Sequence, residues 1–253
     1  MTTPDHPAGH RSPTVSVVMA AFNAERFIGE AIASVLEQQF RDFELLIVND
    51  GSTDSTRDIV QACPDPRLRL IDNGENIGLT RSLNHALTQA RGTYIARQDA
   101  DDVSAPQRLG AQVAFLDARR DVALVGSWFS SIDAHGAVVR QTALPVRHLD
   151  IRWAMFFFCP FVHSAVMWRR ELVHAHIGSY NDTFSYAQDH ELWARIACRF
   201  AVANLPQFLV RYREHPQSMT ETACSRAFGF SAITALIVGR ACRRQRSGRD
   251  SSR

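Results

Sequence analysis

The first half of the chain alternates between apolar runs and helix-like apolar stripes. Residues 15–20 and 43–48 are short runs dominated by Val, Leu and Ile, as in parallel strands that are buried on both faces. Between the two runs, apolar residues recur at the spacing of one helix face, at Phe27, Ile28, Ala31, Ile32 and Val35. The pattern therefore predicts a strand, a helix and a second strand.

The same alternation continues along the chain. We expect short strands at residues 69–71 and 93–98, and helices at residues 79–90 and 106–118. Such alternation predicts an α/β fold with a doubly wound, mostly parallel central sheet and helices on both faces. Ligands of these folds bind beyond the carboxyl ends of the strands. Residues 49–50 and 99–102 lie at two such ends.

The second half of the chain is less regular. We expect strands around a turn at residues 133–136, a helix at 188–200, an alternating strand at 208–212 and a last helix at about 221–243. The aromatic residues Phe156, Phe157 and Phe158 are assigned to the core or to a cleft wall. No linker separates the two halves, so the later part is expected to complete the cleft of one sheet.

The composition is that of a globular protein and argues against a zinc-ribbon, disulfide-rich or membrane-spanning protein. The chain has 253 residues, enough for a large core, and a net charge of only +2. Its five cysteines form no Cys-x-x-Cys pair, which argues against a zinc ribbon or a disulfide framework and fits a reducing cytosol. We expect no secretory signal, and no apolar run reaches the ~18 residues of a membrane span.

Three carboxylates stand within four residues after the strand expected at 93–98. Asp99, Asp101 and Asp102 repel one another, so a cation is expected to offset their charge. An Asp-x-Asp sequence suits a hard divalent cation, Mn²⁺ or Mg²⁺, which takes carboxylate oxygens and keeps positions open for water or phosphate. The alternative is a solvated acidic loop in which Asp102 or Ser104 caps the following helix.

Two common nucleotide-binding motifs do not occur in the sequence. No Gly-x-Gly-x-x-Gly follows the first strand, and there is no Gly-x-x-x-x-Gly-Lys-Ser/Thr, which argues against a dinucleotide fold and a P-loop. A metal on the Asp cluster is then the candidate for holding phosphate. Asp50, at the neighbouring strand end, would contact the base or ribose of a nucleotide. The alternative is that the Asp-Gly-Ser turn beginning at Asp50 caps the next helix.

Several blocks of the sequence resemble family 2 glycosyltransferases of the GT-A fold. Residues 13–54 include Asn-Asp-Gly-Ser-Thr-Asp after the second strand, residues 76–84 match the next block, and residues 91–102 match the Asp-x-Asp block. Residues 186–195 resemble the later acidic motif that holds the catalytic base, and residues 212–220 resemble the closing block of bacterial members. The resemblance spans residues 13 to about 220.

The resemblance implies that residues 13–120 form the nucleotide-sugar-binding half of one GT-A domain. Ala21 and Phe22 would line the base pocket through backbone and ring, with strand-end packing as a compatible role. Asp50 looks like the acid that contacts the base. Arg81 looks like a base or phosphate contact, and its alternative is a surface arginine.

The resemblance also implies the residues around the metal. Asp99 looks like the acid on the ribose or diphosphate side, and Asp101 looks like the direct ligand of Mn²⁺ or Mg²⁺. His215, in the closing block, would reach the metal or the diphosphate. His163 follows the aromatic stretch and would face the acceptor. For both histidines the alternative is a packing or surface role.

Residues 121–220 are then the acceptor-binding half, with Asp189 as the catalytic base. Many relatives carry Glu-Asp in this motif, whereas this chain has Gln188 followed by Asp189, so the base assignment rests on Asp189 alone. The base would take the proton of the acceptor hydroxyl. The alternative is that Asp189 caps the helix expected at 190–200.

The function implied by the resemblance is metal-dependent, inverting transfer of one sugar from a nucleotide-diphosphate sugar, with UDP-sugars favoured. The acceptor would be a glycan or a lipid-linked hydroxyl in cell-surface glycan synthesis, and no nucleic acid is expected as a partner. The Gln-x-x-Arg-Trp motif of processive synthases does not occur. Two alternatives stay open: a sugar-phosphate nucleotidyltransferase and an inactive nucleotide-sugar-binding module.

The last segment, residues 221–253, is expected to form an apolar helix followed by a basic tail. Residues 240–253 carry six arginines against one aspartate. A cytoplasmic protein with such a tail is expected to contact the anionic inner face of the cell membrane peripherally. The alternative is a helix packed on the body with a basic end in solution.

Overall fold

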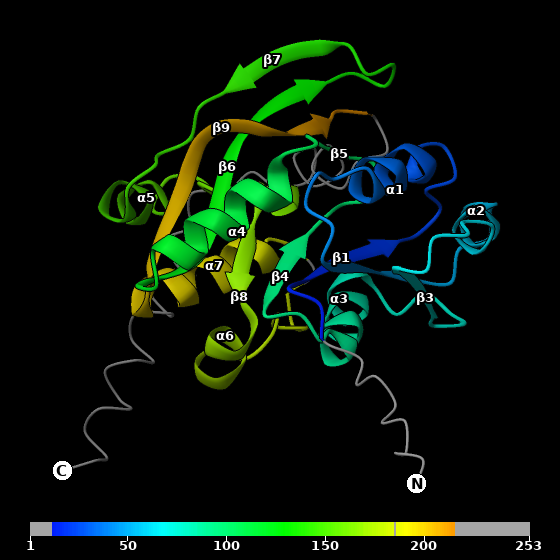
Figure 1. Ribbon diagram of the computed structural model, residues 1–253, viewed down its shortest axis with the longest axis horizontal. Coiled ribbons are helices and arrows are strands. Elements are labelled where there is room, and N and C mark those ends of the chain that lie inside the picture. Colours follow the sequence, from blue (N-terminus) through cyan, green and yellow to red (C-terminus); the bar gives the residue numbers. More distant parts are fainter. Residues whose placement is uncertain (1–11, 185, 216–253) are drawn as a thin grey trace, which may run out of the picture.

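The computed structural model describes residues 12–184 and 186–215, which fold around one nine-stranded sheet (Figure 1). The strands are β1 (Val15–Ala21), β2 (Phe43–Asn49), β3 (Leu68–Asp72), β4 (Tyr94–Arg97), β5 (Val103–Ser104), β6 (Val122–Ile132), β7 (Val138–Thr142), β8 (Met167–Arg169) and β9 (Ala201–Arg213). The helices are α1 (Ile28–Leu36), α2 (Thr56–Gln61), α3 (Leu79–Gln89), α4 (Arg108–Ala118), α5 (His148–Ala154), α6 (Arg170–His176) and α7 (Gln188–Arg199), with a 3-10 turn η1 (His163–Ala165).

The sheet has the strand order β3-β2-β1-β4-β8-β6-β9-β5, and β7 pairs with β6 in the hairpin at the top of Figure 1. Neighbours from β3 to β4 are parallel, β8 is antiparallel to both β4 and β6, and β6 and β9 are parallel. Strands β1, β2, β3, β4, β6 and β9 therefore run in one direction. The predicted α/β class with a mostly parallel sheet is confirmed.

Helices cover both faces of the sheet because its central strands are apolar on both faces. In β1, Val17 and Met19 pack in one core with residues of α1, α2 and α4. Val18 and Ala20, which point the other way, pack in a second core with residues of α3, α5, α6 and α7. The apolar run of β1, interrupted only by Ser16, thus packs in two hydrophobic layers, as expected for a doubly wound sheet.

Two details of the expected secondary structure differ in the structure: one expected strand is longer, and one expected helix cap does not form. The strand expected at residues 208–212 is the end of the longer β9, which is held by β6 along its length and by β5 near its end. Asp102 and Ser104 do not cap a helix: Ser104 belongs to β5, and α4 begins at Arg108 after Gln107. Pairing of this segment with β9 displaces the helix start.

The aromatic run at residues 156–158 does not lie in the core. Phe156, Phe157 and Phe158 expose 44%, 58% and 43% of their surface, so the core assignment is wrong. Within residues 12–184 and 186–215, no helix is long and apolar enough to cross a bilayer. The helix and basic tail expected at 221–253 lie outside the described residues.

The parallel strands β1, β2 and β4 bring their carboxyl ends to one edge of the sheet. Ala21 at the end of β1 is in register with Asn49 of β2, and the N–H of Asp50 donates to the Ala21 carbonyl at 2.8 Å. Beyond β4, the N–H of Gln98 donates to the carbonyl of Val18 at 3.1 Å. The segments that begin at Asp50 and Gln98 therefore leave the same edge of the sheet, on either side of β1.

Candidate active site

Asp99 is held at the end of β4 by a cation and a hydroxyl group. Its carboxylate forms an ion pair with Arg97, which is fully buried. The Ser164 hydroxyl of η1 donates to Asp99 Oδ2 at 2.8 Å and accepts from the Asp99 N–H at 2.9 Å. A quarter of the Asp99 side chain (26%) remains exposed. The carboxylate is therefore fixed in direction yet reachable from solvent.

Asp101 meets a histidine from the end of the described chain. His215 Nε2 lies 3.0 Å from Asp101 Oδ2, although the two residues are 114 positions apart. The His215 ring also packs on Phe27, with ring centroids 5.0 Å apart, and its side chain is 9% exposed. The predicted metal ligand and the predicted C-terminal histidine are thus brought together.

Asp102 and Arg213 lock the Asp cluster to β9. The N–H of Arg213 donates to Asp102 Oδ1 at 2.8 Å, and Arg213 Nε donates to the Asp101 carbonyl at 2.9 Å. Arg213 is itself buried and pairs with Glu30 of α1. Asp102 Oδ2 is buried without a hydrogen-bond partner among the described residues. The closing segment of the chain therefore sets the shape of the acidic turn.

A buried network of hydrogen bonds around Arg108 supports the acidic turn at residues 98–102. Arg108 of α4 donates to the Gln98 Oε1, the Ser104 hydroxyl and the Arg97 carbonyl at 2.6–2.9 Å. Burial lowers the pKa of Arg108 to about 9. Because these acceptors are neutral, the charge of this guanidinium is available to offset the carboxylates above it.

The three carboxylates differ in charge behaviour. Burial opposes ionisation of Asp99, but the charge of Arg97, together with His163 and the hydrogen bonds from Ser164 and Arg97, outweighs it and lowers the Asp99 pKa. Burial and the charge of Asp99 raise the pKa of Asp101. Burial, with the charges of Asp101 and Asp99, raises the pKa of Asp102 well above its usual value. Burial and mutual repulsion thus disfavour the ionised forms of Asp101 and Asp102, and a bound cation would relieve that repulsion.

The donor set fits a cation that is shared with a ligand. Within the described ranges, no three His, Cys, Asp or Glu side chains converge to hold a metal by themselves. A Mg²⁺-type site commonly uses only one or two carboxylates and fills its other positions with substrate phosphate oxygens and water. Asp101, which is 28% exposed, supplies such a carboxylate, and Asp99 lies two residues away.

Asp50 fixes the loop before α3, a role that the sequence did not suggest. Its carboxylate accepts from Asn73 Nδ2 and the Ile77 N–H at 2.9 Å each, and from the Gly78 N–H at 3.0 Å. Asp50 is 3% exposed and ties the end of β2 to the entry of α3. It does not cap α2, whose N-cap position is Ser55.

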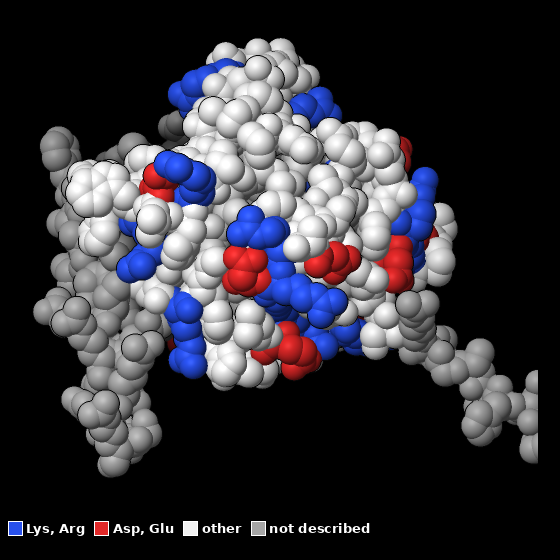
Figure 2. Space-filling view, turned by 60° about the vertical axis from the view of Figure 1, so that its left-hand side comes forward, with Lys and Arg blue, Asp and Glu red and all other residues white. Residues whose placement is uncertain are grey.

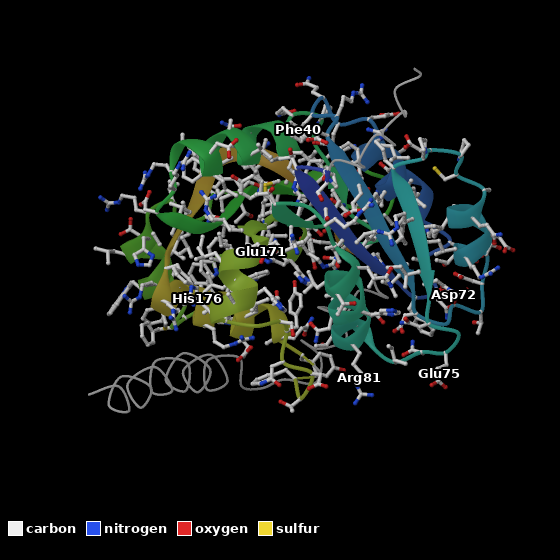
Figure 3. All side chains as sticks on the ribbon, turned by 60° about the horizontal axis from the view of Figure 1, so that its bottom comes forward. Phe40, Asp72, Glu75, Arg81, Glu171 and His176 are labelled. Carbon is white, nitrogen blue, oxygen red and sulfur yellow. The ribbon has the colours of Figure 1, made fainter. Side chains whose placement is uncertain are left out.

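The other residues that the sequence predicts to contact the nucleotide-sugar donor differ in solvent exposure. Ala21 is buried, whereas Phe22 beside it is 49% exposed at the strand end. Arg81 is exposed and projects from α3 into solvent, on the side where Glu75 also projects (Figure 3). Ala21 and Asp50 are joined by a backbone hydrogen bond, and Arg81 follows the loop that Asp50 holds.

Asp189 lies in the first turn of α7, after Ala187 in the left-handed conformation. The N-cap position is Ala187, so the interpretation of Asp189 as the cap is wrong. Burial and then the nearby Asp189 carboxylate raise the pKa of the Cys159 thiol. Asp189 acts in the same electrostatic neighbourhood as His163 and Tyr180.

His163 connects the Asp cluster to this neighbourhood. Its Nε2 accepts from Arg97 Nε at 3.2 Å and lies 2.9 Å from the Tyr180 hydroxyl, while Nδ1 lies 4.0 Å from Asp99 Oδ2. Burial and then Arg97 lower the pKa of His163 to about 4, so the ring is neutral at pH 7. The side chain is 12% exposed, in line with a packing role.

Four contact residues of the site were not identified from the sequence. These are Arg97, Ser164, Tyr180 and Arg213. Arg97 and Arg213 do stand inside the blocks that resemble known glycosyltransferases, next to predicted site residues. Ser164 and Tyr180 carry no local signal, since they reach the site only through the return of the chain along η1 and β8.

Comparison with known proteins relates this chain to a family. The family model described as Glycosyl transferase family 2 matches residues 16–177. The chain is 37% identical to the putative glycosyltransferase EpsE of Bacillus subtilis, covering 92% of this chain and 83% of that protein. It is 33% identical to an uncharacterized glycosyltransferase of Haemophilus influenzae, with 80% of this chain and 66% of that protein covered. It is 27% identical to the O-antigen biosynthesis glycosyltransferase WbnJ of Escherichia coli, with 83% of each covered.

Solved structures with the same GT-A fold cover most of the chain. S. aureus TarS 1–349 in complex with UDP-GlcNAc matches with a TM-score of 0.70 and 20% identity, over 89% of this chain and 70% of that one. Mannosyltransferase PcManGT from Pyrobaculum calidifontis, in complex with GDP-Man and Mn²⁺, matches with a TM-score of 0.63 and 22% identity, over 87% and 61%. At these identities the likeness concerns the fold.

Proposed function

The chain belongs to glycosyltransferase family 2 and is a glycosyltransferase, and from this we propose that it moves one sugar from a nucleotide-diphosphate sugar to a hydroxyl acceptor with a divalent cation. The observation that carries the proposal is the contact of Asp101 with His215, two residues from Asp99, at the sheet edge where Asp50 also lies. This edge is where α/β folds bind their ligands.

The donor is proposed to lie across the ends of β1, β2 and β4. Ala21, Phe22, Asp50 and Arg81 are on the base and ribose side, and Asp99, Asp101 and His215 are on the diphosphate side. Support comes from the raised pKa of Asp101, caused by burial and the Asp99 charge, which marks uncompensated negative charge where a cation would bind. A UDP-sugar is the first choice, since TarS was solved with UDP-GlcNAc, and GDP-sugars follow because PcManGT was solved with GDP-Man and Mn²⁺.

Asp101 would hold Mn²⁺ or Mg²⁺, and Asp99 would be kept ionised beside it by Arg97. When bound, such a cation stabilises the negative charge that develops on a leaving diphosphate. Arg213 and Arg108 would keep the acidic turn in place, through the backbone of Asp101 and through Gln98. The chain thus contributes a fixed carboxylate pair on a rigid support.

Asp189 is proposed to act as general base in a single displacement. The acceptor oxygen forms a bond to the anomeric carbon, the bond from that carbon to the diphosphate breaks, and the hydroxyl proton moves to Asp189. The nucleoside diphosphate leaves with the bonding electron pair, and attack from the opposite face inverts the anomeric centre. Gln188 beside Asp189 carries no charge, so Asp189 is the proton acceptor of this motif.

A glycan or lipid-linked acceptor is proposed on the side of α7. The O-antigen biosynthesis assignment of WbnJ supports a place in surface-polysaccharide synthesis. Acceptors of this class would present a sugar hydroxyl between Asp189 and the diphosphate side. Contact of residues 221–253 with the inner face of the membrane would bring the enzyme to a lipid-linked acceptor.

The test is a donor screen that measures nucleoside diphosphate release from UDP-, GDP- and dTDP-sugars, with Mn²⁺ and with chelator. We expect release with one donor class, loss of release in chelator, and a loss of about 10²–10⁴-fold in Asp189→Asn. Asp182→Asn, an exposed aspartate outside the site, is the matched control and should keep full activity.

The same screen separates the alternatives. A sugar-phosphate nucleotidyltransferase would instead release pyrophosphate from a nucleoside triphosphate and a sugar phosphate. A binding module would retain donor without releasing a diphosphate. Undiminished release of nucleoside diphosphate in chelator would contradict the proposed role of a metal. Full activity of Asp189→Asn would contradict the proposed role of Asp189 as the base.

A further inference from the structure

The helix α5 has an apolar face that does not pack on the protein. Ile151 and Ala154 are buried, and so is Met155 in the turn that follows. On the other side, Leu149 and Trp153 are 73% and 69% exposed. These two residues are four positions apart, so they lie on one face of the helix. The helix is therefore apolar on both sides, and only one side is covered.

Three phenylalanines extend this exposed face. Phe156, Phe157 and Phe158 follow α5, and the Trp153 ring lies 6.3 Å and 5.6 Å from the rings of Phe156 and Phe157. We call Leu149, Trp153, Phe156, Phe157 and Phe158 the α5 aromatic surface. Nine large apolar side chains are exposed in the described ranges, and five of them belong to it. Such a concentration marks an interaction surface rather than scattered surface residues.

The charges beside the α5 aromatic surface are mainly basic. Arg147 and Arg152 are exposed and stand against Asp150 alone. Arg147 pairs with Asp150 at 2.8 Å, and Arg152 has no ion pair within residues 12–184 and 186–215. On the face that Figure 2 shows, basic and acidic side chains are interspersed over the body. Attraction to an anionic partner would therefore be local to this helix and secondary to its apolar contact.

We propose that the α5 aromatic surface docks on the headgroup region of an anionic phospholipid bilayer. A helix that presents Trp, Phe and Leu beside arginines has the chemistry of an interfacial membrane helix, in which the rings enter the acyl boundary and the arginines meet lipid phosphates. A protein partner would need a complementary groove, whereas a bilayer interface accepts an exposed, ring-rich surface without one. The proposal does not depend on sugar transfer, because docking is measured without donor.

The position of this surface near the candidate active site suggests that docking would bring a lipid-carried acceptor to the enzyme. From Phe158 the chain runs through Cys159 to His163 and Ser164, and Ser164 holds Asp99. The segment that would contact the bilayer is therefore only a few residues along the chain from His163 and Ser164, on the proposed acceptor side of the site. A hydroxyl acceptor carried on a lipid would be presented there. This surface belongs to a different part of the chain from residues 221–253, for which membrane contact is expected from sequence.

The first test is flotation of the full chain with vesicles of phosphatidylcholine and phosphatidylglycerol in equal parts. The wild-type chain should float, and Trp153→Ser and Phe157→Ser should each lower the partition coefficient by about tenfold. Because both side chains are exposed, neither change should disturb folding. The matched control is Val138→Ser with Val139→Ser, which removes two side chains of β7 that are 58% and 63% exposed. That control should float as the wild type does.

The second test uses tryptophan fluorescence of the full chain. Of the four tryptophans, Trp168 and Trp193 are buried and Trp128 is partly buried, so Trp153 dominates any response to added vesicles. Its emission should shift to the blue when vesicles are added. Trp153→Phe should lose that shift and still float, since a ring is retained.

Three results would overturn the proposal. Equal flotation of Trp153→Ser, Phe157→Ser and the wild type would move membrane contact elsewhere, for example to residues 221–253. Absence of flotation by the wild-type chain would contradict the proposal that the α5 aromatic surface binds a bilayer. Shielding of Trp153 from acrylamide before any vesicle is added would assign the surface to another segment of the chain or, if sedimentation shows a dimer, to a second copy.

Discussion

Removal of the Arg97 guanidinium, the positive charge paired with Asp99, is the substitution that tests the site most sharply. Arg97 is fully buried, pairs with Asp99, and donates to His163 Nε2 at 3.2 Å and to the Val18 carbonyl at 3.3 Å. Arg97→Met keeps most of the side-chain volume and removes all of these contacts. Asp99 then stands beside Asp101 without its counter-ion.

The expected cost follows from the burial of the pair. Loss of one partner of a buried ion pair costs about 3–5 kcal/mol, because the other charge is left uncompensated. Asp99 is 26% exposed and keeps its two hydrogen bonds to Ser164, so water and the hydroxyl offset part of this loss. We therefore expect Arg97→Met to lower the free energy of unfolding by about 2–4 kcal/mol.

Urea unfolding of wild type, Arg97→Met, Asp99→Asn and the double variant measures this cost. Asp99→Asn should restore part of the loss in the Arg97→Met background, because the stranded charge is gone, giving a coupling of about 1–3 kcal/mol. Arg119→Met breaks an exposed pair with Asp121 and should show no measurable change. A loss in Arg97→Met no larger than in Arg119→Met would refute the reasoning about the buried pair.

Two further predictions concern the sheet that carries the site. The pKa of Glu44 is lowered, since hydrogen bonds from Arg91 and Ser16 outweigh its burial, so its contribution to stability is complete above its unfolded pKa of about 4.3 and declines as pH falls below it. Glu44→Gln should therefore be less stable than wild type at pH 7, with the gap narrowing towards pH 3 in denaturant titrations; a constant gap would contradict this. A Cβ on Gly92 would collide with the backbone nitrogen of Ser16, so Gly92→Ala should cost about 1–3 kcal/mol in thermal unfolding. Gly29→Ala, with nothing within 4 Å, is its control, and equal melting temperatures for the two variants would count against the packing argument.

The sequence determines the α/β class because its signal is physical and local. The apolar runs of β1 and β2 can be buried on both faces only if helices cover both, and the stripe of α1 supplies one such cover. The placement of Asp50 and Asp99 at one edge follows from the parallel order. These features need no knowledge of distant contacts.

The remaining features depend on contacts that the local pattern does not encode. Asp50 turns its carboxylate to the N–H groups of Ile77 and Gly78, which requires the loop before α3 to fold back over β2. Arg213 reaches the Asp cluster only because β9 pairs with β5. The exposure of Phe157 was missed because an apolar run reads the same in a core and on an uncovered surface. Hydropathy alone does not distinguish the two.

The most direct test of the central claim is calorimetric titration of UDP, GDP and dTDP into the full chain with Mn²⁺ and with chelator. We predict that one nucleoside diphosphate binds with Mn²⁺, that chelator or Asp101→Asn weakens binding at least tenfold, and that Asp189→Asn binds within a few-fold of wild type. Equal affinity of Asp101→Asn and wild type in Mn²⁺, or binding lost in Asp189→Asn and kept in Asp101→Asn, would contradict the proposed division between diphosphate site and catalytic base.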